Sequence, residues 1–262
     1  MKNKIILLSL VMSILLFFSC QREHGSAVRN GASAGNDSVE ISSIRNQGYA
    51  LRANTAFYTI LGDDAGDETT RVRWAAGMSL GEKILTGETR RMTLEDGRVF
   101  DFIAVSRDNG TEGYAFAAQV GVGGSLAVVV DESANLFRAP RPVDVSGIIL
   151  SRKSVVVYYP ETENNGFLQV RGFDPARQAN IALDNNYVRL SSLSSRDSDI
   201  QSAILLQTAL SLPPAQNIRR EALLNSALYD FPNSVFNAEI FEIVFPDAVA
   251  SASPEINDKI DQ

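Results

Sequence analysis

The stretch Leu94-Glu95-Asp96-Gly97-Arg98-Val99 decides the local fold of the first half of the chain, because it places an Asp-Gly pair between two runs of alternating apolar and polar residues. Asp-Gly readily adopts the positive φ angles that a two-residue hairpin turn requires. Alternation with a period of two is typical of strands that bury one face. The stretch therefore predicts an antiparallel hairpin whose second strand covers Val99 to Arg107.

Further alternating runs, broken by Gly, Asn and Asp, extend this pattern on both sides of the hairpin. They predict strands at Tyr49 to Arg52, Met78 to Leu85 and Gly113 to Val120. The chain from residue 48 to residue 193 is accordingly predicted to be mainly β.

The second half of this β segment repeats the first. Thr55-Ala56-Phe57-Tyr58 has a counterpart in Ser133-Ala134-Asn135-Leu136-Phe137, and Glu112-Gly113-Tyr114-Ala115 has one in Asn185-Asn186-Tyr187-Val188. The two offsets, about 78 and about 73 residues, agree to within one loop insertion. The stretch Gly121 to Ser125 separates the blocks and is predicted to be a hinge. The pattern indicates two copies of one small all-β unit.

Each copy resembles the bacterial SH3-like domain, a small barrel common in exported and cell-wall proteins. The resemblance rests on Ala56-Phe57-Tyr58 after an early strand and on Gly113-Tyr114-Ala115 as a late motif, with Tyr for the common Trp. In the second copy, Asn186-Tyr187-Val188 keeps the aromatic residue and the Val. The resemblance implies two tandem SH3-like small barrels, at residues 48–122 and 126–193, followed by a short C-terminal helical segment.

Helical periodicity replaces alternation in the last part of the chain. Asp197 or Ser198 is predicted to cap a helix that stops at Pro213-Pro214, and a second helix is predicted from Ala215 to Tyr229. The run Val235 to Phe245 fits a helix or a strand. We assign residues 196–245 to a helical segment and the Ser-, Asp- and Pro-rich residues 246–262 to a disordered tail.

The N-terminus has the layout of a secretory signal peptide. Lys2 and Lys4 precede a mainly apolar run from Ile5 to Phe18, which ends at Ser19-Cys20. At 14 residues this run is short for a transmembrane helix, which needs about 20 apolar residues. Residues 1–19 are therefore predicted to be a signal peptide.

Cys20 is the only cysteine of the chain, which excludes an intramolecular disulfide. The run Leu16-Phe17-Phe18-Ser19-Cys20 resembles the lipobox of bacterial lipoproteins in its looser, spirochaete-type form: it keeps Ser19 but has Phe17 and Phe18 where the usual pattern has Leu and a small residue. The resemblance implies cleavage before Cys20 and lipidation of its sulfur. An uncleaved anchor with a buried thiol is the alternative. Residues 20–47, which are polar, are predicted to be a flexible tether.

Charge and export define the predicted partners. Of the 24 Lys and Arg residues two lie in the signal peptide, so 22 remain against 31 acidic residues, a net charge of −9. This balance excludes nucleic acid as a predicted partner, because phosphate binding relies on clustered basic residues. The predicted partner is the lipid bilayer, through acyl chains on Cys20, on the periplasmic face or the outer surface of the cell envelope. The second predicted partner is peptidoglycan or another envelope protein.

The chain is poor in groups for common hydrolytic chemistry. His24 is the only histidine and lies in the tether, so ordinary zinc sites and nucleophilic triads lack their parts. No catalytic residue, metal site or cofactor is predicted. The run Asp63 to Glu68 is rich in carboxylates but lacks the spacing of an EF-hand calcium loop, so we interpret it as a solvated acidic loop. Gly121 to Gly124 is interpreted as a linker, since no helix follows it as in a phosphate-binding loop.

Core packing is the default interpretation of the aromatic residues. The functional interpretation is that some of them line a shallow groove between barrel loops, since the resemblance implies that aromatics of SH3-like folds bind peptides or glycans. The candidate ligand-binding residues are Tyr58, Trp74, Tyr114, Phe137 and Tyr187.

The first functional hypothesis is a non-catalytic binding or scaffold lipoprotein, in which paired modules on one tether gain avidity if both reach one target. The second is a carboxylate-dependent cell-wall glycan hydrolase, because Asp and Glu are plentiful. A surface adhesin is a third, which differs from the first in location.

Overall fold

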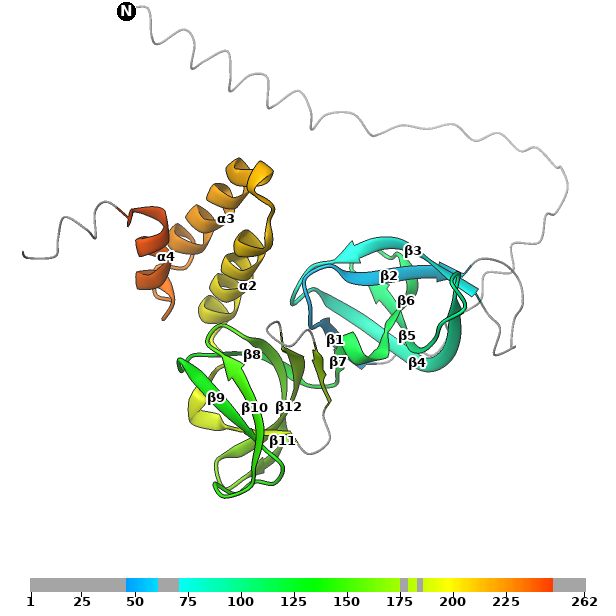
Figure 1. The fold of residues 1–262 in the computed structure, drawn as a ribbon, viewed down its shortest axis with the longest axis horizontal. Coiled ribbons are helices and arrows are strands. Elements are labelled where there is room, and N and C mark those ends of the chain that lie inside the picture. Colours follow the sequence, from blue (N-terminus) through cyan, green and yellow to red (C-terminus); the bar gives the residue numbers. More distant parts are fainter. Residues whose placement is uncertain (1–45, 61–70, 175–178, 183–185, 247–262) are drawn as a thin grey trace, which may run out of the picture. The chain divides into compact units, whose positions relative to one another are not determined.

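The structure, a computed structural model, describes residues 46–60, 71–174, 179–182 and 186–246 (Figure 1). Within these ranges the chain is mainly β, with two sheets followed by helices. The elements of the first sheet are β1 (Asn46–Ala50), β2 (Thr55–Ile60), β3 (Arg71–Met78), β4 (Lys83–Leu94), β5 (Val99–Arg107), β6 (Glu112–Phe116), the 3₁₀ turn η2 (Ala117–Gln119) and β7 (Val120–Val122). Those of the second are β8 (Ser125–Val129), β9 (Ser133–Phe137), β10 (Val145–Ser151), β11 (Val155–Asn164), β12 (Phe167–Asp174), β13 (Ala179–Ile181), β14 (Tyr187–Arg189), the 3₁₀ turn η3 (Leu190–Ser192) and β15 (Leu193–Ser194). The helices are α2 (Asp197–Ser211), the 3₁₀ turn η4 (Pro214–Gln216), α3 (Asn217–Tyr229) and α4 (Asn237–Val244).

The two sheets share one strand order. The first runs β3-β2-β6-β5-β4-β1-β7 and the second runs β10-β9-β14-β12-β11-β8-β15, with β13 added beside β12. In each sheet a 3₁₀ turn leads into the last strand, which then pairs with the first strand of that sheet, β7 with β1 and β15 with β8. One arrangement of strands is therefore built twice along the chain.

The first sheet is not a barrel, which corrects the prediction for residues 48–122. Its longest strand, β4, pairs with β5 and β1, whereas β3 meets β4 only in the parallel pairs Arg71↔Thr93 and Val72↔Leu94. β1 and β7 continue the sheet on the other side of β4. In the second sheet, the pairings among described strands run along one path from β10 to β15, without a ladder joining those two ends. A small SH3-like barrel is thus not confirmed there.

The hairpin predicted around Asp96-Gly97 is confirmed. Gly97 has a φ of 85° and its amide donates to the Leu94 carbonyl at 2.9 Å. The Asp96 carboxylate accepts a hydrogen bond from the Arg98 backbone amide at 3.0 Å, and this side-chain contact stabilises the turn. β5 then occupies Val99–Arg107, as the alternation predicts.

The three other strand predictions are wrong in extent. The strand predicted from Tyr49 to Arg52 shares only Tyr49 and Ala50 with β1. The predicted strand from Met78 to Leu85 is interrupted by a turn, because Gly81 has a φ of 73° and donates its amide to the Ala50 carbonyl at 2.8 Å. The predicted strand from Gly113 to Val120 is likewise divided, since η2 lies between β6 and β7.

Glycines allow close backbone approaches at two places. A Cβ on Gly113 would lie 2.5 Å from the Tyr58 carbonyl oxygen and 2.4 Å from Cζ of Phe57. A Cβ on Gly121 would lie 2.5 Å from Cγ2 of Val157. Gly121 belongs to β7 and pairs with Tyr49. The predicted hinge from Gly121 to Ser125 is therefore corrected: its first residues are paired strand packed against β11.

The helical segment begins and ends close to its predicted bounds, and the ambiguous run after Val235 contains the helix α4. The N-cap of α2 is Arg196 and it makes no side-chain capping hydrogen bond, so the predicted cap at Asp197 or Ser198 is wrong. Ala203, Leu206 and Phe236 share one buried cluster with Val128 and Val155 of the second sheet. The helices therefore complete the core on that part of the sheet. Among the described residues no helix has the length and apolar character to cross a membrane.

The turn between β10 and β11 holds α4 in place. Lys153 has a positive φ of 72° and forms an ion pair with Glu239 of α4. The neighbouring Arg152 donates to the Val235 carbonyl at 3.2 Å, and its guanidinium lies 5.1 Å from the centre of the Phe236 ring.

Asp199 joins three segments and is completely buried. Its carboxylate accepts hydrogen bonds from the Ser194 hydroxyl at 2.5 Å, from Arg196 Nε at 2.8 Å and from the Val235 amide at 2.9 Å. Burial alone raises the pKa of Asp199, but these hydrogen bonds and the Arg196 charge outweigh it and hold the pKa below its ordinary value. The carboxylate thus ties β15 and the start of α2 to the chain before α4.

Replacement of this carboxylate tests its role. We expect Asp199→Asn to lower the free energy of unfolding of the full chain at pH 7 by about 2–3 kcal/mol, because a buried charge-assisted acceptor is lost. Because the folded pKa lies below the unfolded one, this contribution is present above the unfolded pKa of about 4 and is lost as pH falls through the folded pKa. Urea denaturation followed by circular dichroism at pH 7 and at pH 3 measures both effects.

The matched control is Asp197→Asn, which removes the same charge two residues earlier in α2. Asp197 is exposed and only accepts a hydrogen bond from Gln201 Nε2 at 3.4 Å. We expect it to change the unfolding free energy by less than about 0.5 kcal/mol. Equal midpoints for the two variants would contradict the anchoring role of Asp199.

Candidate functional site

A cavity of about 540 Å³ opens beside the β4–β5 hairpin of the first sheet. Its walls come from β2, from the start of β5, from the end of β6 with η2, and from β12 of the second sheet. The side chains that determine its chemistry are Tyr58, Arg98, Phe100, Asp101, Phe116 and Arg171. Its volume falls in the range of small-molecule and peptide side-chain pockets.

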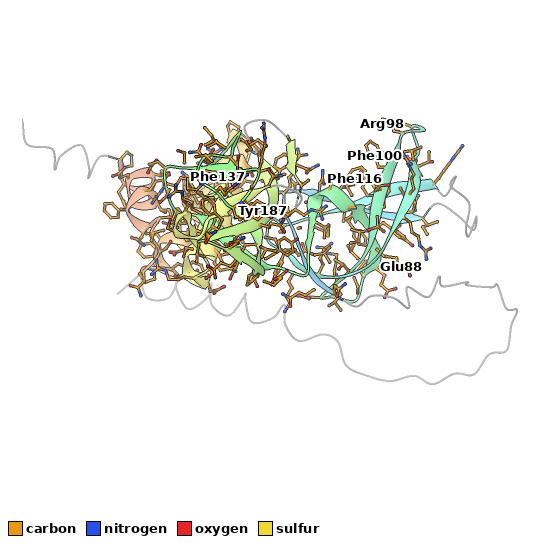
Figure 2. All side chains as sticks on the ribbon, turned by 90° about the horizontal axis from the view of Figure 1, so that it is seen from below. Glu88, Arg98, Phe100, Phe116, Phe137 and Tyr187 are labelled. Carbon is orange, nitrogen blue, oxygen red and sulfur yellow. The ribbon has the colours of Figure 1, made fainter. Side chains whose placement is uncertain are left out.

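Aromatic rings form the apolar wall of this cavity. The Phe116 ring lies 4.9 Å from Phe100 and 5.2 Å from Tyr58, with interplanar angles of 66° in both pairs. Tyr58 also meets the completely buried Phe102 edge to face at 5.2 Å. Phe100 is 37% exposed, whereas Tyr58 is buried. This row of ring contacts therefore starts in the core at Phe102 and ends at the surface at Phe100. Figure 2 shows Phe100 and Phe116 close to Arg98.

Arg98 at the hairpin turn is already neutralised by its neighbour. Its Nε and one Nη lie 2.8 Å and 2.7 Å from the Asp96 carboxylate. The hydrogen bond from Arg98 lowers the pKa of Asp96, and Asp96 in turn raises the pKa of Arg98. The guanidinium lies 5.7 Å from the centre of the Phe100 ring, within cation–π range. Arg98 therefore covers one edge of the aromatic wall.

Tyr58 contributes a neutral phenol. Burial raises its pKa above the ordinary tyrosine value, and this effect outweighs the opposing charge of Arg98. Because the phenol stays protonated at neutral pH, it presents a ring edge and a hydroxyl and carries no charge.

Arg171 provides the second cation of the cavity. One Nη donates to the Ala117 carbonyl at 2.6 Å, which fixes the guanidinium against η2. Its Nε is buried and has no hydrogen-bond partner among the described residues. None of the described carboxylates lies within ion-pair distance of this guanidinium, in contrast to Arg98. Arg171 is thus a positioned cation with a donor left over.

The candidate aromatics from the sequence fall into two separate pairs. Tyr58 pairs with Tyr114 across β2 and β6, and Phe137 pairs with Tyr187 across β9 and β14, where Figure 2 shows them adjacent. Tyr58, Tyr114 and Phe137 are buried, whereas Tyr187 is half-buried. The Tyr187 hydroxyl accepts a hydrogen bond from Gln169 Nε2 at 3.0 Å. These four aromatic residues therefore do not line one groove, because each packs against the residue paired with it on the neighbouring strand.

Trp74, the remaining candidate, lies on β3 and is 63% exposed. It pairs with Tyr58 across the β2–β3 ladder but does not line the cavity. Cys20, His24 and the acidic run from Asp63 to Glu68 lie outside the described residues, so the structure neither places nor excludes their predicted roles.

Sequence reasoning missed Phe100, Phe116, Arg98 and Arg171. The sequence did contain a signal for Phe100, because Phe100 and Phe102 are two residues apart on β5 and so lie on the same face of that strand. No local signal pointed to Arg171, which reaches the cavity from the second repeat. Among the described residues no group of His, Cys, Asp and Glu is arranged to hold a metal ion.

Comparisons with known proteins add little to this site. A scan against protein-family models matches none of them, and a search of curated proteins finds no significant match. Among solved structures, NlpC2 from Trichomonas vaginalis is similar over 63% of this chain, at 11% identity and a TM-score of 0.22. The match spans 55% of the NlpC2 chain. At that TM-score the similarity supports no conclusion about fold or function.

Neighbouring phenylalanines on β5 distinguish the core from the site. We expect Phe102→Ala to cost about 3–5 kcal/mol of unfolding free energy because its side chain is fully enclosed. We expect Phe100→Ala to cost about 1 kcal/mol, since its ring is 37% exposed. Urea denaturation of both variants measures the difference. Similar losses for the two would contradict the assignment of Phe100 to the surface of the cavity.

Proposed function

We propose that this chain is a membrane-anchored lipoprotein of the cell envelope that acts as a non-catalytic binding or scaffold module for a peptide, a cell-wall fragment or another envelope protein. The observation that carries the proposal is the cavity beside the β4–β5 hairpin, with its aromatic wall and its fixed cation. An apolar cavity with a few positioned polar groups is the usual form of a ligand site.

The character of the side chains supports binding without catalysis. The cavity offers one neutral phenol, two guanidinium groups, the side-chain amides of Gln119 and Asn180, and the carboxylate of Asp101. Glycoside hydrolysis ordinarily uses a pair of facing carboxylates. A single carboxylate beside aromatic rings is better suited to recognition than to acid–base chemistry.

We further propose that the two repeats are related to SH3-like domains through their strand order. In each repeat a 3₁₀ turn leads into a short last strand that returns to the first strand. This shared arrangement supports the relationship for the order of the strands, without a closed barrel in the first repeat.

Membrane anchoring depends on Cys20 and is tested on living cells. We expect the wild-type chain to incorporate radiolabelled palmitate and to sediment with membranes, because two or three acyl chains anchor a protein stably. Cys20→Ser removes the only thiol and should abolish both. Membrane association and label that persist in Cys20→Ser would contradict the proposed anchor.

Binding is tested by sedimentation of the full chain with purified peptidoglycan, together with an assay for released muropeptides. We expect binding without release, and we expect Phe100→Ala to weaken it by roughly fivefold to thirtyfold, as truncation of an aromatic hot spot does. Tyr229→Ala is the matched control, because Tyr229 is an aromatic residue of α3 with 65% exposure and lies outside the cavity.

Each outcome has a distinct meaning. Release of muropeptides would contradict the non-catalytic proposal in favour of a glycan hydrolase. Equal binding by Phe100→Ala and the wild type would contradict the cavity as the binding site.

A further inference from the structure

We infer that the cavity beside the β4–β5 hairpin binds a peptide that carries one carboxylate next to an apolar or aromatic side chain, with Arg171 as the group that binds the carboxylate. This inference rests on the proposed binding function and names the ligand class for the same site.

The unused donor on Arg171 is the first argument. Buried polar groups in proteins are almost always hydrogen-bonded, and leaving a donor of a charged group without a partner is costly. Here Nε is buried and has no partner among the described residues, while one Nη is held by the Ala117 carbonyl at 2.6 Å. The guanidinium is therefore fixed in orientation before any ligand arrives. A guanidinium held in this way can pair with a carboxylate without losing further freedom.

The charge balance of the cavity is the second argument. Arg98 is neutralised by Asp96 at 2.7 Å, so it does not offer a free charge. Arg171 has no such partner among the described carboxylates, and Asp101 lines the same cavity. The arrangement attracts one carboxylate to Arg171 but repels further negative charge near Asp101. A singly charged peptide fits this pattern, whereas a polyanion does not.

The aromatic wall is the third argument. Phe100 and Phe116 meet edge to face at 4.9 Å and line the cavity together with Tyr58. Their rings offer apolar surface beside the guanidinium. A side chain adjacent to the bound carboxylate would cover Phe100, which is 37% exposed in the free protein. A neutral glycan would use the rings but would leave the charge of Arg171 without a counterion.

Matched probes test the inference on the full chain in detergent micelles. The probes are N-acetyl-alanyl-phenylalanine as the free acid, the same dipeptide as its carboxamide, and N-acetyl-glutamyl-phenylalaninamide, whose carboxylate is on a side chain. Affinities of the wild type and of each variant are measured by isothermal titration calorimetry. The contact is located in the ¹⁵Nε–¹Hε spectrum of arginine-labelled wild type, in which the Arg171 signal is assigned by its loss in Arg171→Lys.

We expect the free acid to shift the Arg171 signal and to bind at least tenfold more tightly than the carboxamide, because a hydrogen bond to a charged group is lost. The glutamyl probe shows whether a side-chain carboxylate serves equally well as a terminal one. Arg171→Gln should weaken the acid at least tenfold and leave the carboxamide unchanged. Arg90→Gln, which removes an exposed arginine outside the cavity, should change neither.

The outcomes separate this inference from the proposed function. Equal affinities for acid and carboxamide would overturn the carboxylate assignment but leave a binding cavity. No binding of any probe to the wild type would overturn the inference, and loss of peptidoglycan sedimentation as well would overturn the proposed function. If Arg171→Gln fails to fold, Arg171→Lys keeps the charge without Nε, and an unchanged preference for the acid in that variant would overturn the role of Nε. Phe100→Ala should weaken acid and carboxamide alike, so a change in their ratio would also count against the inference.

Discussion

A long-range pairing between an early strand and a late strand joins distant parts of the chain within each sheet. In the first repeat this pairing joins Tyr58 to Tyr114, and in the second it joins Phe137 to Tyr187. In the first repeat it requires Gly113, since any side chain there would meet the Tyr58 carbonyl at 2.5 Å. β6 also pairs with the preceding strand β5, and the rings of Phe100 and Phe116 meet at 4.9 Å. The β2–β6 pairing adds Tyr58, whose ring lies 5.2 Å from Phe116, and so completes the aromatic wall of the candidate site.

Local patterns predicted the parts of the fold that local forces determine. The Asp96-Gly97 turn, the strand β5 and the helices α2 and α3 were predicted close to their observed bounds, because turn chemistry and periodicity act over a few residues. The barrel in the first repeat was not correctly predicted, because closure depends on how far β3 runs beside β4, which no local pattern encodes. The glycines at Gly121 to Gly124 were interpreted as a hinge, although composition cannot distinguish a flexible segment from one that needs close backbone contact.

The candidate site shows the same limit more sharply. Tyr58 was identified from the sequence, but Phe100 and Phe102 alternate identically on β5 and differ only in what covers them. The cavity needs Arg171 from the other repeat, and only the three-dimensional arrangement brings it to Ala117. Sequence reasoning therefore named one aromatic residue of the cavity wall and missed the guanidinium that the second repeat brings to it.

The helices after the second repeat have a consequence for how such a chain can grow. Ala203, Leu206 and Phe236 share a core with Val128 and Val155, so the apolar surface of β8 and β11 is already occupied there. A further unit could not pack on that face without displacing the helices, which cover it much as terminal caps cover the last repeat of a solenoid protein.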